Sequence, residues 1–206
     1  MIRNQLRPAI LMTLVLCVVT GFVYPGVVTG IAQLLFSRQA NGSLVTVNGK
    51  VVGSELIGQS FAQPYYFHSR PSAAGSGYGA TASAGSNKGP TDAKLADTLI
   101  ASRVDSAVAT DHAVKGAVPS DMVTASASGL DPHISPANAY LQVARVARAR
   151  GVDSLRVREV LDRHVDGRQF GFFGDPRVNV LKLNIALDAA FPRGGRDSSA
   201  VKPISP

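Results

Sequence analysis

Residues 8–37 read PAILMTLVLCVVTGFVYPGVVTGIAQLLFS, and this stretch decides how the chain is organised. No charged residue occurs between Arg7 and Arg38, and Leu, Val, Ile, Ala and Phe dominate. A helix needs about 20 apolar residues to cross the core of a bilayer, so the stretch predicts a transmembrane helix. A cleaved signal peptide is the alternative, because Arg3 and Arg7 precede the apolar run as a positive n-region does. The length of the run and its lack of a small-x-small site favour a retained anchor.

The charges on either side of the predicted span indicate its orientation. Arg3, Arg7 and the terminal amine lie on the short side, which the positive-inside tendency places in the cytoplasm. Arg38 and Lys50 weaken the asymmetry, but a long domain is translocated largely regardless of its charge. We therefore expect a single-pass membrane protein, in contact with lipid, with its C-terminal domain outside the cytoplasm.

Within the span, Gly26 and Gly30 have the small-xxx-small spacing that lets two helix backbones approach closely. Pro25 precedes them, removes one helical hydrogen bond and predicts a kink. One interpretation is that this glycine face packs against a partner helix, helped by the polar residues Thr29 and Gln33. The alternative is that glycine is simply common in membrane helices.

The chain after the span begins with β structure. Asn48 and Gly49 separate two short valine-rich runs, which predicts a hairpin at about residues 44–52. Ser, Ala, Gly and Thr dominate residues 72–91, a composition typical of a flexible loop. Between them lies an aromatic cluster that we expect to be buried: Phe61, Tyr65, Tyr66 and Phe67.

The later part of the chain predicts helices. Ser135 and Pro136 are typical of a helix start, and the pattern runs to Gly151, a suitable C-terminal glycine. The other three predicted helices are residues 92–109 capped by Thr91, a short helix from Asp153 to about His164, and a last helix that includes Val178, Leu181 and Ile185. A hairpin with several helices predicts an α+β fold, one mixed domain behind a single membrane helix.

These predictions give four regions along the chain. Residues 1–8 form a short cytoplasmic N-terminus and residues 9–36 the transmembrane helix. Residues 37–191 form the extracytoplasmic domain, which contains the flexible loop 72–91. Residues 192–206 form a disordered tail, because GGRDSSAVKPISP lacks an apolar pattern.

The net charge of +7 and the pI of 9.9 raise the question of nucleic acid. The sequence has no recognisable nucleic-acid module and no tryptophan, so we expect no such partner. Arg145 begins a run of seven arginines that ends at Arg168, interleaved with acidic residues. This pattern predicts a solvated helical surface for most of them.

Residues 126–136, SASGLDPHISP, contain the residue types of a hydrolytic site. Ser126, Ser128, Asp131 and His133 are the candidates for a membrane-anchored hydrolase, although the GxSxG frame of a nucleophile elbow is missing. The alternative is a rigid corner, because Gly129 and the Asp131–Pro132 step break the chain before the next helix.

No metal or nucleotide site is expected from the remaining motifs. The four histidines, His68, His112, His133 and His164, form no pair with a short ligand spacing. Neither a GxxxxGK[ST] loop nor a DKTG phosphorylation motif occurs. We therefore expect no catalytic residues, no metal and no cofactor of the chain's own.

Six ordered segments between residues 24 and 188 resemble the C subunit of the Kdp potassium-transporting ATPase, a bacterial inner-membrane complex. They are YPGVVTGIAQLLF, NGKVVGSELIGQSF, YFHSRPSA, SNKGPT, VPSDMVTASASGLDPHISPANAYLQVARVARARG and GRQFGFFGDPRVNVLKLNIALD. Asp92 after GPT, and the forms HVDGR and GDPR, depart from the usual family wording but conserve charge or size.

The resemblance implies a non-catalytic subunit with one membrane helix and an outer domain. Its partners would be a channel-like potassium-binding subunit, a P-type ATPase subunit and a small membrane peptide, and ATP and potassium would be bound through the complex. In this family the C subunit is described as a catalytic chaperone that raises the ATP affinity of the ATPase subunit. Under this interpretation Gly26 and Gly30 dock the helix, and Asp131 and His133 brace the corner or meet a partner.

Overall fold

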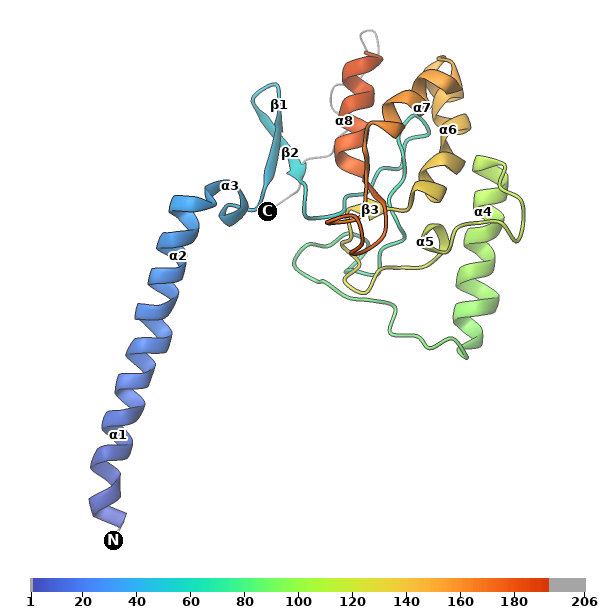
Figure 1. Cartoon of the computed structure of the whole chain (residues 1–206). Helices are drawn as coiled ribbons and strands as arrows, with labels where there is room; N and C mark the ends of the chain where they lie inside the picture. Colours follow the sequence, from blue (N-terminus) through green and yellow to red (C-terminus); the bar gives the residue numbers. More distant parts are fainter. Residues whose placement is uncertain (1, 193–206) are drawn as a thin grey trace. The chain divides into compact units, whose positions relative to one another are not determined.

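A computed structural model describes residues 2–192 of the chain (Figure 1). The chain divides into two compact units, residues 1–44 and 45–206, and each is described separately below. Of the predicted tail, residues 193–206 lie outside the described residues.

The first unit is a long helix made of three consecutive segments. These are α1 (Ile2–Val18), the π-helical η1 (Val19–Val23) and α2 (Tyr24–Leu35), and the short α3 (Ser37–Ala40) follows them. Among the described residues, one helix is long and apolar enough to cross a membrane, the 32 residues Asn4–Leu35, and none of it is buried within the chain. The predicted single apolar helix ahead of an α+β domain is confirmed.

Pro25 coincides with the change of helix type. Its missing N–H would leave a carbonyl one turn earlier without a partner. The structure has the wide π-helical turn of η1 directly before it, in which the Tyr24 N–H donates to Val19 O. Helices commonly accommodate a proline through such a local change of hydrogen-bond register.

The second unit opens with the predicted hairpin. Strand β1 (Leu44–Val47) pairs with β2 (Lys50–Ser54) in a two-stranded sheet. Asn48 and Gly49 have φ of 51° and 77°, the positive values that a two-residue type I′ turn requires. The hairpin is confirmed.

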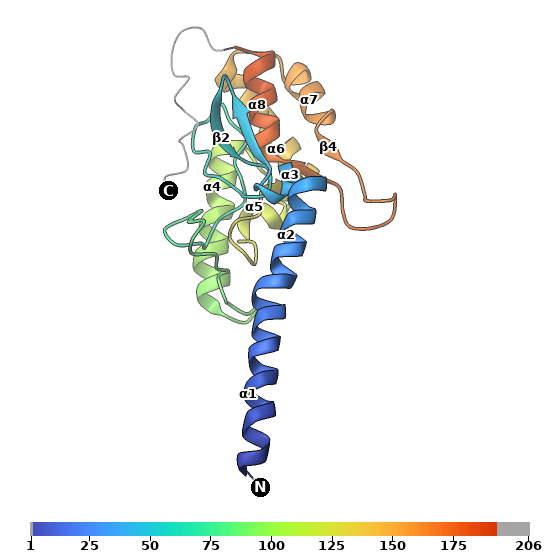
Figure 2. The same cartoon turned by 90° about the vertical axis from the view of Figure 1, so that its left-hand side faces the viewer.

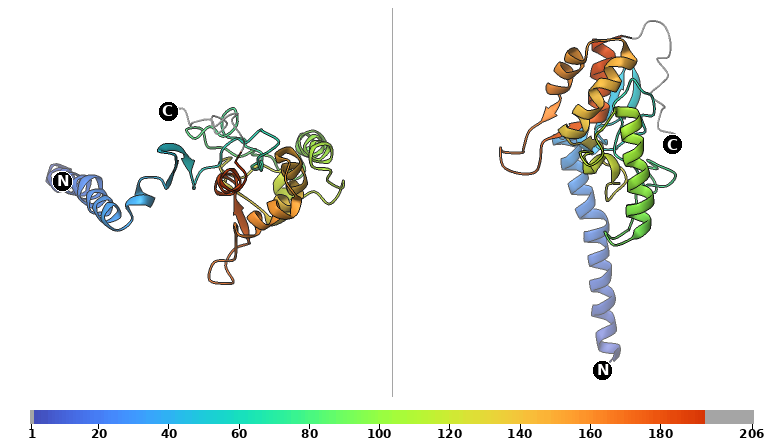
Figure 3. Two further views of the ribbon diagram at one scale, coloured as in Figure 1. Left: turned by 90° about the horizontal axis from the view of Figure 1, so that it is seen from above. Right: turned by 90° about the vertical axis from the view of Figure 1, so that its right-hand side faces the viewer.

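Three capped helices cover the core. The side chain of Ser135 caps α6 (Pro136–Arg150), and Gly151 ends it at φ 66°. Asp153 caps α7 (Ser154–Asp162), and Asn179 caps α8 (Val180–Ala190). Helix α7 packs on α6 and on α8, as Figures 1 and 3 show in orange and red. The first two of these helices begin where the sequence predicted.

The prediction for Val178 was wrong. Val178 lies in β5 (Arg177–Asn179), the middle strand of a small antiparallel sheet in the order β3-β5-β4. It is fully buried opposite Ile134 of β3 (His133–Ile134) and Val165 of β4 (Val165–Asp166). The apolar residues from Val178 onward have helical spacing, which is why one helix was predicted. The first of them pair instead with strands that are distant in the sequence.

The start of the helix after the loop also differs from the prediction. It begins as the π-helical η2 (Lys94–Ile100) and continues as α4 (Ala101–Asp111), ahead of the short α5 (Ser120–Val123). The capping side chain is Asp92, not Thr91: Asp92 Oδ1 accepts from Leu95 N at 3.0 Å and Oδ2 accepts from Lys88 Nζ at 2.7 Å. A carboxylate has two oxygens, so each of the two donors has an acceptor atom of its own.

The core lies between the aromatic segment and the last three helices. Tyr66 and Phe67 are almost completely inaccessible, as are Leu161, Leu183 and Leu187. Phe61 is buried and Tyr65 partly buried, so the predicted burial of the aromatic cluster is confirmed. The hairpin and the segment after it run along α8, as Figure 2 shows in cyan.

Candidate functional site

The glycine face of the span is open within this chain. A Cβ atom added at Gly26 or at Gly30 would meet no other atom within 4 Å. Both residues lie in α2 and are separated by one turn, so they leave a shallow groove on one face of the helix. The geometry allows close approach of another helix backbone.

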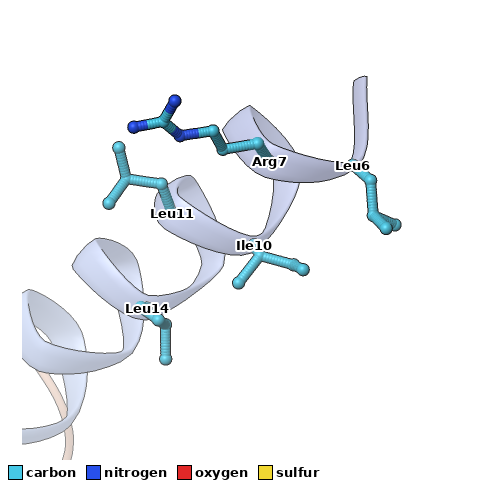
Figure 4. A pocket seen from close by; sticks show the side chains of 5 residues that line it. All are labelled: Leu6, Arg7, Ile10, Leu11 and Leu14. Atoms are coloured by element: carbon cyan, nitrogen blue, oxygen red, sulfur yellow. The ribbon is translucent and has the colours of Figure 1, made fainter. Parts of the chain in front are cut away.

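A hollow along α1 has no features of a ligand site. It is lined by Leu6, Arg7, Ile10, Leu11 and Leu14, which extend from successive turns of the same helix (Figure 4). Four of the five side chains are aliphatic, so the surface suits lipid chains or another helix.

Asp131 and His133 lie together in the corner. Asp131 Oδ1 accepts from the His133 backbone N at 2.9 Å and lies 3.4 Å from His133 Nδ1. Asp131 Oδ2 pairs with Arg70 Nη1 at 3.1 Å. Burial raises the pKa of this carboxyl, but the hydrogen bonds from His133 and the charge of Arg70 outweigh it, so the pKa lies below its usual value. Asp131 is therefore held as a carboxylate that joins two segments distant in sequence.

The backbone around Asp131 is packed too closely for side chains. Gly129 has φ 67°, and a Cβ there would lie 2.6 Å from Ala84 O and 2.7 Å from Ala74 N. A Cβ on Gly58 would lie 2.6 Å from Asp131 O. Ser72 Oγ donates to Gly129 O at 2.6 Å, and Ala84 N donates to Ser128 O at 3.0 Å. The corner and the loop 72–91 are thus joined by several backbone contacts.

The far end of the corner is held by Asp121 of α5. Its carboxylate accepts from Ser135 N at 2.7 Å, from Ser135 Oγ at 2.9 Å and from Asn138 Nδ2 at 3.0 Å. Ser135 Oγ in turn accepts from Asn138 N at 3.1 Å. The helix cap is therefore part of a hydrogen-bonded group that links α5 to α6.

The structure does not assemble a serine nucleophile from the four hydrolase candidates. Ser128 Oγ accepts from Leu130 N at 3.1 Å, and Ser126 is buried. Within residues 2–192, no hydrogen bond joins either serine to His133, whose ring lies beside Asp131. A serine hydrolase requires the base within hydrogen-bond reach of the hydroxyl, so the geometry favours the structural role of this corner.

The four histidines contact different parts of the chain. His68 Nε2 bonds to Gln63 O, His112 Nε2 to Arg148 Nη1 and His164 Nδ1 to Val160 O. In the described part of the chain, no group of three or more His, Cys, Asp or Glu is placed to hold a metal ion.

Two of the seven arginines are exceptions to the predicted solvated surface. Arg145 is buried, and its Nε pairs with Asp111 Oδ1 at 2.7 Å. Its other nitrogens donate to Pro64 O, Tyr66 O and Gln142 Oε1. Arg150 also has a buried side chain, pairs with Asp188 at 2.9 Å and donates from Nε to Tyr65 O at 2.7 Å. Both hold the aromatic segment against the helices.

A polar cavity of about 160 Å³ lies beside this network, lined by residues that include His68, Arg103, Ser106, Thr110 and Asn138. Burial, followed by the charge of Arg145, lowers the pKa of His68 below its usual value. His68 is thus neutral at pH 7, and its ring is already bonded to Gln63 O at 3.1 Å.

Sequence reasoning missed Arg70 and Asp121, the two partners that fix the corner. Each lies in one of the segments quoted for the family resemblance, YFHSRPSA and VPSDMV. The resemblance therefore pointed to these segments but not to the two residues themselves. Their pairing with residues 61 and 14 positions away is a tertiary contact that no local spacing reveals.

Comparison with known proteins places most of the chain in one family. A family model described as "K+-transporting ATPase, c chain" (KdpC) matches residues 6–189. A potassium-transporting ATPase KdpC subunit of Gemmatimonas aurantiaca is 61% identical over 187 residues, which covers 90% of this chain and 93% of the relative. The corresponding subunits of Methylococcus capsulatus and Koribacter versatilis are 57% and 50% identical, over 90% and 92% of this chain and 98% and 97% of their own lengths.

The match spans the apolar helix, the corner and the last helix alike, at identities well above those at which a family is in question. The chain belongs to the KdpC family, the C chains of K+-transporting ATPases.

Proposed function

We propose that this protein is a non-catalytic subunit of an ATP-driven, high-affinity potassium uptake pump. The observation that carries the proposal is the family match over residues 6–189, which includes both the membrane helix and the domain. The corner supports it, since its serine, histidine and aspartate side chains bond to backbone and to Arg70 and form no nucleophile-base pair.

The subunit assembles with the potassium-binding and ATP-hydrolysing subunits and with a small membrane peptide. It is anchored in the inner membrane by residues 9–36 of the apolar helix, with residues 1–8 in the cytoplasm and the domain outside it. It has no cofactor of its own, and ATP and potassium belong to its partners. Asp131 and His133 either brace the corner or face a partner subunit.

The subunit also raises the affinity of the ATPase subunit for ATP. An outer domain cannot touch nucleotide in the cytoplasm, so the effect is a coupling free energy transmitted through the membrane helix or the partner subunits. Such couplings are typically about 1–3 kcal/mol, or about 5- to 150-fold in affinity.

The test is a pull-down from detergent-solubilised membranes with an affinity tag on this chain. Recovery of a potassium-stimulated ATPase together with the tagged chain is the expected result. Recovery of the chain alone, with esterase or peptidase activity, would overturn the proposal and support the anchored hydrolase.

A further inference from the structure

Three phenylalanines project from the loop between β4 and β5. Phe170, Phe172 and Phe173 are 81%, 66% and 58% exposed. Figure 2 shows this segment, in orange, extending away from the helices of the domain, and Figure 3 shows the same from another side. Single exposed apolar residues are common on protein surfaces, but three aromatic rings within four positions form a patch that calls for an explanation.

The loop is fixed in shape by its own hydrogen bonds. Gln169 N donates to Phe173 O at 2.9 Å, and Phe173 N donates to Gln169 O at 2.9 Å. Gly171 N donates to Arg168 O at 3.1 Å. The rings of Phe172 and Phe173 are in contact, with their centres 4.2 Å apart. The rings are therefore presented on a preorganised loop, which reduces the entropy lost on binding.

Phe170 has an unfavourable backbone conformation as well as an exposed side chain. Its φ is 54°, in the left-handed region that bulky side chains rarely adopt. Residues held in such conformations are concentrated at binding sites, where a partner makes use of the side chain that they present.

From these observations we infer that Phe170, Phe172 and Phe173 insert into an apolar pocket on a membrane-embedded protein subunit of the pump. The inference rests on the proposed function and names the surface that the domain would use for assembly. A fully covered aromatic side chain buries about 150–250 Å², and these three are 81%, 66% and 58% exposed, so together they would supply about 400 Å², roughly half of the 800 Å² that each partner contributes to a standard interface.

Charges near the loop favour a protein over lipid as the occupant. Arg168 and Asp175 pair at 3.5 Å at the base of the loop, and Asp166 and Arg177 are opposite each other in β4 and β5. Mixed signs around an apolar centre are typical of the rim of a protein interface. Segments that bind anionic lipid carry an excess of Lys and Arg, whereas two acidic and two basic residues flank this loop.

The short connection to the span limits which partners lie within reach. Helix α2 ends at Leu35 and the domain begins at Val45, so residues 36–44 connect them. Nine residues extend to about 30 Å at most, at roughly 3.3–3.6 Å each. The domain is therefore tethered to a helix of the same pump, and the tether keeps the other membrane subunits at a high effective concentration.

The test compares two triple variants of the full chain, expressed with the other pump subunits and recovered through a tag on the ATPase subunit. The first is Phe170→Asn/Phe172→Ser/Phe173→Ser, in which Asn tolerates the positive φ at position 170. The matched control is Leu56→Ser/Val114→Ser/Leu155→Ser, at residues that are 60%, 71% and 67% exposed elsewhere on the same domain. We expect recovery of the phenylalanine variant to fall about tenfold or more, as for hot-spot aromatic residues, and that of the control to change less than about twofold.

A second measurement does not depend on the folding of the triple variant. Phe172 is replaced by the photoreactive analogue p-benzoylphenylalanine, and the expected crosslink is to a protein subunit of the pump. Crosslinks to lipid alone, or undiminished recovery of the phenylalanine variant, would overturn the inference and leave the proposed function intact. Failure of the unaltered chain to co-purify would overturn the proposed function and this inference with it.

Discussion

At the scale of single residues, the buried arginines show most clearly what the tertiary structure adds. Arg145 uses its guanidinium on Asp111, on Gln142 and on the carbonyls of Pro64 and Tyr66. In the sequence it is one of seven arginines on a basic, acid-interleaved stretch, and nothing local distinguishes it from its neighbours. Its partner Asp111 lies 34 residues earlier in the chain, so the pair becomes visible only when α4 meets α6.

The first prediction concerns Arg145→Lys and follows from the planar guanidinium group of Arg145, which donates to several acceptors at once. Lysine keeps the charge but cannot reach Asp111, Gln142 and two carbonyls at once. Loss of two charge-assisted hydrogen bonds, each contributing about 1.5–3 kcal/mol, lowers the free energy of unfolding by about 3–6 kcal/mol. Denaturant titration of the full chain in detergent, followed by circular dichroism, measures the change.

Arg158→Lys is the matched control for this prediction. The side chain of Arg158 is 61% exposed and lies 3.9 Å from Asp162, an exposed pair of the kind that contributes little. We expect its effect to stay within about 0.5 kcal/mol. Equal midpoints for the two variants would show that the Arg145 network does not contribute to stability.

At the scale of helices and strands, local chemistry was a good guide wherever an element is fixed by its own ends. Asn48 and Gly49 set the hairpin, and Ser135, Pro136 and Gly151 set the bounds of α6, because these residues act on neighbouring backbone groups. The pattern failed at Val178, since burial in a three-stranded sheet and burial on a helix select the same residue type.

The corner at residues 126–136 was predicted from the sequence only in part. Its break before α6 was predicted from Gly129, Pro132 and Ser135. Its partners Arg70 and Asp121 were not, because they come from other segments and only the fold brings them to Asp131 and Ser135. The residue types of the corner are also those of a hydrolase active site. The hydrogen bonds of Ser128 and His133, which only the structure shows, argue against that function.

The span allows a prediction of its own, for Gly26→Leu/Gly30→Leu. Leucine side chains would fill the groove between these positions and keep a partner backbone at a distance, and we expect co-purification with the other subunits to fall about tenfold. Val27→Leu/Ile31→Leu, with the same spacing on an adjacent face, is the control and should assemble normally. Both variants must reach the membrane in equal amounts, measured by immunoblot of washed membranes. Equal recovery of the two would contradict the role of the glycine face.

At the scale of the whole molecule, the central question is how a subunit without a nucleotide site affects one. On the proposed topology most of the chain lies across the membrane from ATP. A coupling of about 1–3 kcal/mol then requires that the chain bind one conformational state of the pump more tightly than another. The membrane helix and the phenylalanine loop are the two surfaces that would bind one conformational state of the pump more tightly than the other. The role of the loop depends on which side of the membrane the domain occupies.

The topology is tested with single cysteines, since Cys17 is the only cysteine of the chain. In a Cys17→Ser background, Asn4→Cys reports the N-terminus and Lys115→Cys reports the domain, where the Lys115 side chain is 78% exposed. With a membrane-impermeant maleimide, we expect Lys115→Cys to be labelled in intact spheroplasts and Asn4→Cys only after lysis, because Arg3 and Arg7 retain the N-terminus in the cytoplasm. The opposite pattern would place the domain beside the nucleotide, and the coupling across the membrane would then be replaced by direct contact with the ATPase subunit.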